Sequence, residues 1–160
     1  MNNCLSSNIE EIKWSKMGYI SVFDHWLDEV EADECKILCY SIAKDSDVLD
    51  EYLDSEKKFI NFYTSLSDQA YCFYKDSWQL FNTNSEKFER ILKRSLREER
   101  LDFFDIYYPN YSLRFKGGHD RTDAFFIEDI RFLSDLSKAV EINGLFILSI
   151  QDYSEDLDRV

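Results

Sequence analysis

The sequence predicts a single α+β domain, made mainly of antiparallel sheet and packed with several helices. The clearest sign of a sheet is a strand in which Tyr111, Leu113 and Phe115 alternate with polar side chains, as in a strand with one buried face. Aromatic residues make up 16% of the 160 residues, which is enough for one sizeable core. One Pro and four Gly leave little material for a linker or a second domain. We therefore expect residues 1–160 to form one domain, with an acidic helical N-terminal third (1–56) and a sheet-rich remainder.

We expect the N-terminal third to be mainly helical. Ser7 and Glu10 have the spacing of a capping box, so a helix is expected through about Met17, ending at Gly18. The further elements expected here are a strand at 19–23, a helix at 24–34, a helix from about 32 to 44 and a short helical turn after Ser46.

The middle of the chain contains an aromatic-rich segment and an amphipathic helix. Residues 59–81 fit either a hairpin that turns at Ser67-Asp68 or parts of two helices, and the hairpin is favoured because β-branched and aromatic residues dominate. A helix should begin near Thr83 and Glu86, which have capping-box spacing. We expect the bases of this helix to pair with acids of the N-terminal third rather than to form a binding site. These bases are Lys87, Arg90, Lys93, Arg94, Arg97 and Arg100.

The last third should contain a meander, a helix and a central strand. Residues 101–128 are predicted to form three antiparallel strands, with turns at 109–110 and at 117–118, where glycine allows a positive φ. The remaining elements expected are a helix from Asp129 to Asn143-Gly144 and, at 145–150, an apolar strand covered on both faces.

The charge limits the partners that the chain can bind. It has 32 acidic and 19 basic residues and a net charge of −13. Residues 1–56 carry 14 acidic and 4 basic residues, whereas residues 57–160 carry 18 and 15. Phosphates of nucleic acid or of a membrane surface would repel such a chain, so the expected partner is a cationic protein. The alternative is that the charge serves only solubility.

The cysteines indicate packing rather than chemistry. Cys35 and Cys39 are four residues apart and would share one helix face with apolar neighbours. They lack the two-residue Cys spacing typical of zinc sites, so we expect no metal at these residues and His25, and no cofactor. The N-terminus lacks a signal-peptide pattern, and no apolar run approaches the ~20 residues that span a bilayer. A cytoplasmic protein with reduced thiols is therefore expected.

An enzymatic function has one candidate cluster, formed by Arg114, His119, Asp123 and their neighbours near one end of the meander. A histidine base beside a carboxylate and guanidinium groups could serve phosphoryl transfer, provided that the three residues converge on a pocket. Residues 117–123, GGHDRTD, also have the composition of a polar hairpin loop, and this interpretation is favoured. The chain has no phosphate loop, dinucleotide-binding glycines, nucleophile elbow or HExxH motif. We therefore do not expect an enzyme, and keep this cluster as the alternative.

Residues 24–34, DHWLDEVEADE, contain six acids, no base and a tryptophan. In this segment, in size and in its α+β pattern, the chain resembles the immunity proteins of bacterial polymorphic-toxin and contact-dependent growth inhibition systems. The resemblance implies binding to the toxin domain encoded by a neighbouring gene and obstruction of its active site, and many of those toxins are nucleases with basic clefts. Opposite potentials would accelerate association, and carboxylates could occupy positions meant for phosphates.

The contacts expected for such an immunity protein lie in two places. Aromatic side chains such as Trp26 and Tyr40 could act as desolvated anchors if they are exposed. The loop of the meander is a secondary candidate because it is polar and displayed by rigid strands. A second binding hypothesis is a phage-type nucleic-acid mimic that inhibits a host DNA-binding protein, which predicts two rows of carboxylates at duplex phosphate spacing. The expected partner contacts are Asp24, Trp26, Asp28, Glu29, Glu31, Asp33 and Glu34, with His119, Asp120 and Arg121 in the secondary contact loop.

Overall fold

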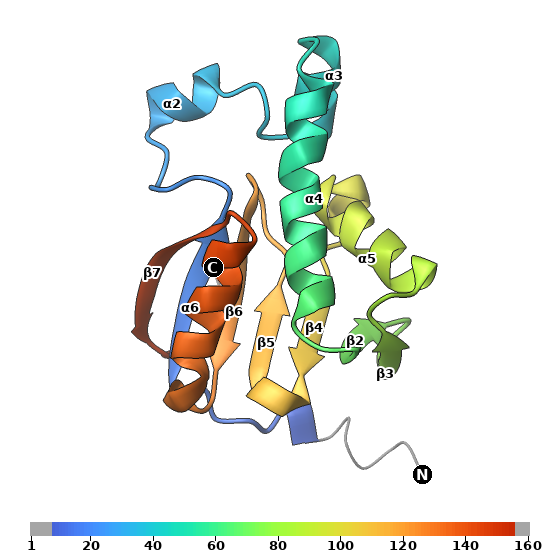
Figure 1. Ribbon diagram of the computed structural model, residues 1–160, viewed down its shortest axis with the longest axis vertical. Coiled ribbons are helices and arrows are strands. Elements are labelled where there is room, and N and C mark those ends of the chain that lie inside the picture. Colours follow the sequence, from blue (N-terminus) through green and yellow to red (C-terminus); the bar gives the residue numbers. More distant parts are fainter. Residues whose placement is uncertain (1–7, 156–160) are drawn as a thin grey trace.

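The computed structural model describes residues 8–155, which contain one seven-stranded antiparallel sheet (Figure 1). The strands are β1 (Lys16–Ser21), β2 (Gln69–Tyr74), β3 (Ser77–Asn82), β4 (Asp105–Tyr108), β5 (Leu113–Lys116), β6 (Thr122–Ile127) and β7 (Phe146–Asp152). They follow the order β3-β2-β4-β5-β6-β1-β7, and every neighbouring pair runs antiparallel. The strand nearest the N-terminus therefore lies between two of the last strands.

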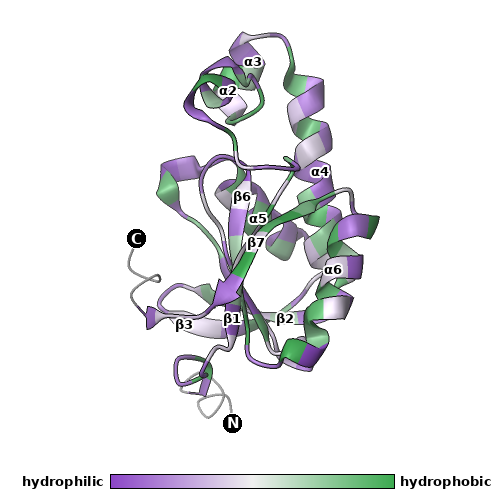
Figure 2. Cartoon of the chain, turned by 90° about the vertical axis from the view of Figure 1, so that its left-hand side faces the viewer, coloured by the Kyte–Doolittle hydropathy of each residue, from purple (hydrophilic) through white to green (hydrophobic). Residues whose placement is uncertain are grey.

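Helices form a second layer on one face of the sheet (Figure 2). The three main helices are α4 (Leu49–Ser65), α5 (Glu86–Leu96) and α6 (Leu133–Ile142). Two short helices, α2 (Glu29–Glu34) and α3 (Tyr40–Asp45), lie at one end of the molecule, near the start of α4 (Figure 1). Short 3-10 turns occupy Glu99–Leu101, Pro109–Tyr111 and Ile130–Phe132. The predicted single α+β domain with a mainly antiparallel sheet is confirmed.

The main core lies between the sheet and these helices. Alternation along β5 and β6 directs Phe115 and Phe125 toward the helices, where both are fully buried. Phe62 and Tyr63 of α4 pack edge-on against Phe115, with ring centroids 5.6 and 5.3 Å from its own. Edge-on aromatic pairs add to the stabilisation that burial gives, so α4 is held to the centre of the sheet.

The other face of the sheet is covered only in part. Ile9, Trp78 and Tyr107 form a smaller buried cluster there, and Trp14 packs against it. This cluster lies under the first described residues of the chain. Over β1 and β6, residues 23–38 lie beside the same face of the sheet and border the candidate functional site.

The predicted meander is confirmed, because β4, β5 and β6 are consecutive neighbours in the sheet. The reason given for its glycines is wrong. Positive φ angles occur at Asp120 and Arg121, not at Gly117 or Gly118. Space explains the second glycine, since a Cβ on Gly118 would lie 2.4 Å from the carbonyl oxygen of Thr122.

Two of the helices match their predictions closely. α5 begins one turn after Thr83, but its cap is Ser85, whose hydroxyl accepts from the amide of Phe88 at 3.2 Å. The predicted end of α6 is confirmed, because the helix ends at Ile142 and Gly144 follows with a φ of 70°.

The bases of α5 pair as expected at one position. Arg97 holds Glu56 of the N-terminal third by two hydrogen bonds of 2.7 and 2.8 Å. Lys93 instead pairs within the helix with Glu89, at 2.6 Å. The first pair joins α4 to α5 beside the core, whereas the second lies in solvent and adds little stability.

The predicted N-terminal helix is wrong. Ser7 lies outside the described residues, and between residues 8 and 17 only residues 8–9 are helical. The chain instead enters β1 at Lys16 and continues as a strand through Gly18. Because β1 pairs with β6 on one side and β7 on the other, its conformation is set by partners more than 100 residues away in sequence.

Gly18→Ala is expected to lower the free energy of unfolding by about 2 kcal/mol. A Cβ at this position would lie 2.2 Å from the carbonyl oxygen of Ser149 and 2.5 Å from Phe125 Cζ, so β1 would have to move away from β7. Urea unfolding of both proteins measures the change. Ser134→Ala on the exposed side of α6 is the control and should shift stability by less than about 0.5 kcal/mol. An unchanged urea midpoint for Gly18→Ala would contradict the packing described for β1.

The predictions for residues 24–81 need four corrections. The acidic helix is confined to α2, and the helix expected at 32–44 is reduced to α3. Cys35 therefore follows α2 and Cys39 precedes α3, so the two cysteines do not share one helix face. The short turn after Ser46 is the 17-residue α4, because a repeating set of its side chains reaches the core. The hairpin is β2–β3 and turns at 75–76, where both residues have positive φ.

Residues 145–150 do form a strand, but β7 is an edge strand and not a central one. It pairs with β1 alone, and Phe146 and Ile150 remain 43% and 41% exposed. The apolar composition misled the prediction because Ile147 packs against the core while its neighbours do not.

Candidate functional site

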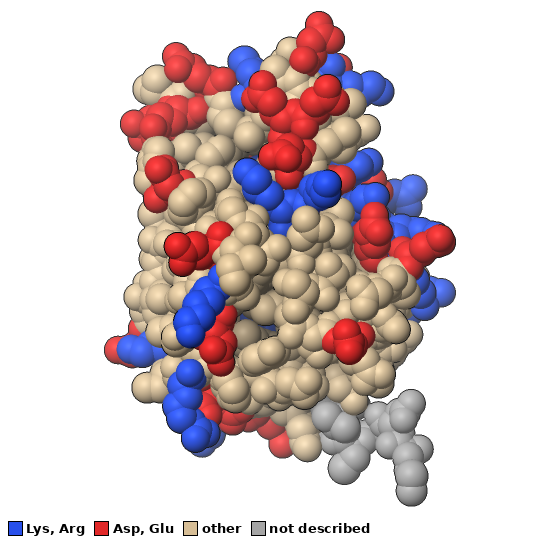
Figure 3. Space-filling model, in the orientation of Figure 1, with Lys and Arg blue, Asp and Glu red and all other residues tan. Residues whose placement is uncertain are grey.

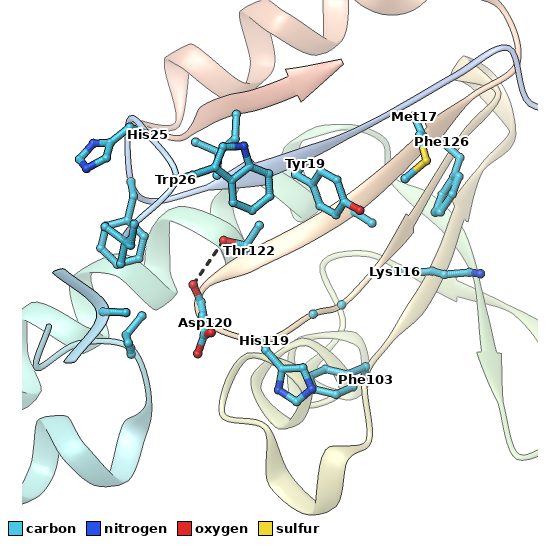
Figure 4. Close-up of a pocket in the computed structure, with 18 residues that line it drawn as sticks. Met17, Tyr19, His25, Trp26, Phe103, Lys116, His119, Asp120, Thr122 and Phe126 are labelled. Carbon is cyan, nitrogen blue, oxygen red and sulfur yellow. Dashed lines mark hydrogen bonds between the residues drawn. The ribbon is translucent and has the colours of Figure 1, made fainter. Parts of the chain in front are cut away.

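A pocket of about 490 Å³ lies on the face of the sheet opposite α4 and α6 (Figure 4). Its floor comes from β1, β5 and β6, and its walls come from residues 23–38 and from the loop between β5 and β6. The side chains that line it include Met17, Tyr19, Trp26, Phe103, Lys116, His119, Asp120, Thr122, Ala124 and Phe126. A volume of this size is typical of sites that bind a small ligand or a few side chains of a partner.

The alternation of two neighbouring strands supplies the floor. Met17 and Tyr19 of β1 lie directly opposite Phe126 and Ala124 of β6, so all four point to the same face. Phe125 lies between the last two and points into the core instead. Because both faces of β6 carry apolar residues, this strand forms the core and the pocket floor at once.

The acidic segment forms one wall and is ordered by its own hydrogen bonds. Asp28 caps α2 by accepting from the amide of Glu31 at 2.9 Å, and the Glu31 carboxylate accepts in return from the amide of Asp28 at 2.9 Å. His25 bridges Asp24 and Glu31 at 2.6 and 2.9 Å. The hydrogen bond to Asp24, followed by that to Glu31, raises the pKa of His25, and the bond from the Asp28 amide lowers the pKa of Glu31. These hydrogen bonds give the segment a defined conformation in the absence of a partner. They involve three predicted contact residues, Asp24, Asp28 and Glu31, together with His25.

The predicted contact residues of this segment divide into three kinds. Glu29, Asp33 and Glu34 are exposed on α2. Trp26 is 52% exposed, lines the pocket and packs edge-on against Tyr19 with ring centroids 5.2 Å apart. The remaining residues, Asp24, Asp28 and Glu31, are exposed but engaged in the hydrogen bonds of the segment.

Tyr40, the other aromatic anchor considered from the sequence, is placed differently. It packs edge-on against Tyr52, with ring centroids 5.4 Å apart, and the guanidinium of Arg97 lies over its ring at 4.5 Å. Both contacts tie α3 to α4 and α5. The ring therefore serves the packing of α3 and is separate from the pocket.

The secondary contact loop forms another wall of the same pocket. His119 and Asp120 both line it, and His119 also contacts Glu98 and the edge of the Phe103 ring. Two segments that the sequence separates by more than 80 residues therefore meet across one cavity (Figure 4). Both histidines of the chain lie on its lining.

The expectation for Arg121 is wrong, because this residue is only 3% exposed. Its guanidinium lies over the ring of Tyr52 at 4.1 Å and donates to Ser55 Oγ at 2.7 Å and to the carbonyl oxygen of Leu96 at 3.1 Å. Burial lowers its pKa, although nearby acidic and phenolic groups oppose this effect. Arg121 thus anchors the loop to α4 from below and presents no charge to a partner.

The trio Arg114, His119 and Asp123 does not converge on one pocket. Arg114 forms two hydrogen bonds of 2.8 and 2.7 Å with Asp105 and lies over Trp78. Asp123 points to the helix side of β6, where it accepts from the Tyr63 hydroxyl at 2.8 Å. Of the three, only His119 reaches the pocket. The arrangement required for the phosphoryl-transfer alternative is therefore not present in this structure.

Asp123 nevertheless supports the site, in a role that the sequence did not reveal. It is 2% exposed and accepts a second hydrogen bond, from the amide of Gly118, at 3.0 Å. Burial raises the pKa of its carboxyl group to about 6, against the opposing effects of Tyr63 and Gly118. It therefore fixes the first part of the loop that carries His119 and Asp120. A single aspartate in an alternating strand gave no sequence signal of this role.

No group of three or more His, Cys, Asp and Glu side chains among residues 8–155 is arranged to hold a metal ion. Cys72 is buried, and burial raises the pKa of its thiol. The carboxylates of α2 also fit poorly with a nucleic-acid mimic, since six helical residues span only about 9 Å, less than three steps of a duplex strand.

Comparisons with protein-family models, with curated proteins and with solved structures find no match. None of the helices in the described part of the chain is both long and apolar enough to cross a membrane.

Proposed function

We propose that this chain is an immunity protein, which binds a cognate bacterial toxin domain, in the simplest case a nuclease, and neutralises it. The observation that carries the proposal is the meeting of the acidic segment and the 119–120 loop around one aromatic pocket. Each of the two segments has the properties of a contact surface. Their convergence gives a single surface with a concave apolar centre and a charged rim, which is how stable protein interfaces are organised.

Charge supports a basic partner. Exposed carboxylates gather at the end of the molecule that carries α2, α3 and the start of α4, as Figure 3 shows. Glu29, Asp33 and Glu34 add to this group beside the pocket. A nuclease cleft is basic because it binds phosphates, so the two surfaces would attract each other before contact. Occupying that cleft would keep its substrate out.

Co-expression tests the proposal directly. The toxin domain encoded beside the gene for this chain should stop growth alone, and this chain should restore growth and copurify with the toxin at low salt. Because salt screens the attraction between exposed charges, the complex should form more slowly as the salt concentration rises. Absence of both rescue and complex would overturn the proposed function.

Reversing two charges of α2 measures the electrostatic contribution. Asp33→Lys with Glu34→Lys is expected to slow association about tenfold at low salt, with the effect shrinking at high salt. Both residues are exposed in the last turn of α2, where lysine suits the helix dipole, so stability should be retained. Stopped-flow association measures the rate.

The matched control changes the net charge equally, at the opposite end of the sheet. Asp68→Lys with Glu128→Lys replaces two exposed acids that do not line the pocket. We expect this variant to associate at nearly the rate of the unmodified chain. If both double variants slow association equally, overall charge rather than the α2 surface governs binding, and the proposed location of the interface is wrong.

A further inference from the structure

We propose that the pocket receives a basic side chain of the partner, an arginine or a lysine, between the ring of Trp26 and the carboxylate of Asp120. The source of this side chain rests on the proposed function, because only a protein partner would present it. The chemistry that selects a cation belongs to the pocket itself and can be tested without the partner.

Asp120 supplies the charge at one end of the pocket. Its backbone has a φ of 56°, and its carbonyl oxygen accepts from the Thr122 hydroxyl at 3.3 Å, which fixes the turn. Within residues 8–155 its carboxylate has neither a hydrogen bond nor an ion pair. Figure 4 shows Asp120 on the loop beside His119, below Trp26 and Thr122 in this view, and all four residues line the pocket. The carboxylate is therefore available to a cation that enters from solvent.

The other polar groups of the pocket do not favour an anion at this end. The amides of Gly117 and Gly118 are already bonded, to the Phe104 carbonyl oxygen at 2.9 Å and to Asp123 at 3.0 Å. His25 lies between two carboxylates, and His119 contacts Glu98. Each histidine is thus paired with at least one carboxylate of the chain.

Lys116 is the remaining cation on the lining, and it lies at the other end. Its amino group is over the Phe126 ring at 5.2 Å, and Figure 4 shows it pointing away from Asp120. Asp120 and Lys116 thus mark opposite ends of the pocket. A basic side chain fits the end marked by Asp120.

The aromatic walls suit a guanidinium or an ammonium group. Trp26 is half exposed, and indole faces attract cations more strongly than other aromatic rings do. The chain itself uses this contact repeatedly, with Arg121 over Tyr52 at 4.1 Å and Arg114 over Trp78 at 5.2 Å. A partner arginine would repeat an arrangement that the fold already contains.

The size of the pocket indicates that a second side chain of the partner enters it beside the basic one. About 490 Å³ exceeds the volume of one side chain, and Met17 and Phe126 line the end far from Asp120. An apolar side chain next to the basic one would cover these residues. We therefore infer that the recognised element is an apolar residue followed or preceded by a basic one on an exposed loop.

The experiment compares two peptides on the full chain by titration of its backbone amide signals in NMR spectra. The probes are acetyl-Phe-Arg-amide and acetyl-Phe-citrulline-amide, which have nearly the same shape but differ in charge. The arginine peptide should bind about tenfold more tightly and shift signals of residues around Trp26, Gly118 and Asp120. Asp120→Asn should remove the preference for arginine, and it should fold because asparagine tolerates a positive φ. Asp68→Asn, outside the pocket, should keep the preference.

Three outcomes would overturn the inference: equal binding of both peptides, shifts confined to other surfaces, or an unchanged preference in Asp120→Asn. Its failure can be told apart from failure of the proposed function. If the chain neutralises the toxin but shows no preference for arginine, only the occupant of the pocket is wrong. If the preference is present and no toxin complex forms, the cation site stands and the proposed function falls.

Discussion

Trp26→Ala is expected to weaken binding of the toxin domain about 30-fold or more, corresponding to about 2 kcal/mol. The indole is 52% exposed at the pocket and would be desolvated on binding, which is the situation of most interface residues with large effects. The loss should appear mainly as faster dissociation, since a neutral ring contributes little to steering. Equilibrium binding and dissociation rates of the purified complex measure it.

The fold should survive this change. Trp26 contacts Tyr19 on the open face of the sheet, and the main core lies on the opposite face. Phe73→Ala is a matched control, because Phe73 is a similarly exposed aromatic residue, at 47%, on a strand near the other edge of the sheet. It should leave affinity unchanged. Equal losses for the two variants would remove the pocket from the interface.

Asp123→Asn is expected to change how stability depends on pH. The folded-state pKa of Asp123 is about 6, above the ordinary value of 3.8, so the folded protein binds this proton more tightly than the unfolded chain does. The resulting stabilisation is fully present below about pH 4 and is lost as the pH rises through about 6. Between pH 4.5 and 7.5 the loss amounts to about 2 kcal/mol. Asparagine does not titrate, so the variant lacks this component.

Urea unfolding of both proteins at several pH values isolates the effect, because their other titrating groups are the same. The stability of the unmodified chain relative to the variant should fall by about 2 kcal/mol from pH 4.5 to 7.5. Asp68→Asn, at an exposed aspartate, should show no such trend. Parallel curves for the unmodified chain and Asp123→Asn would mean that the Asp123 carboxyl is not buried as described.

The sequence predicted those parts of the fold that local patterns determine. The meander and the last helix carry alternation, turn residues and caps within a few positions of each other, and both were located correctly. The second half of β1 overlaps the strand predicted at 19–23, but its first half has no such local signal, because Gly18 is a strand residue only through its contacts with β6 and β7. The length of α4 was missed for a related reason. Its aromatic residues have strand propensity, and their helical conformation depends on packing against the distant sheet.

The candidate site divides in the same way. Composition singled out the acidic segment and the polar loop, but their meeting depends on the pairing of Ser21 with Thr122 across β1 and β6. That pairing joins residues about 100 positions apart, and no local pattern in a single sequence indicates it. For Arg121 the prediction from the sequence was wrong. A guanidinium in a polar loop is expected to be exposed, but this one is buried against Tyr52 and Ser55 of α4.

Hydrogen exchange of the chain alone and in complex with the toxin domain tests the location of the proposed interface, since it reports which surface is covered. We expect slower exchange in residues 24–34 and in the loop containing His119 and Asp120, with β2 and β3 unchanged. Protection confined to the helix layer of α4 and α6, or to the β3 edge, would contradict the proposed interface even if the chain neutralises the toxin.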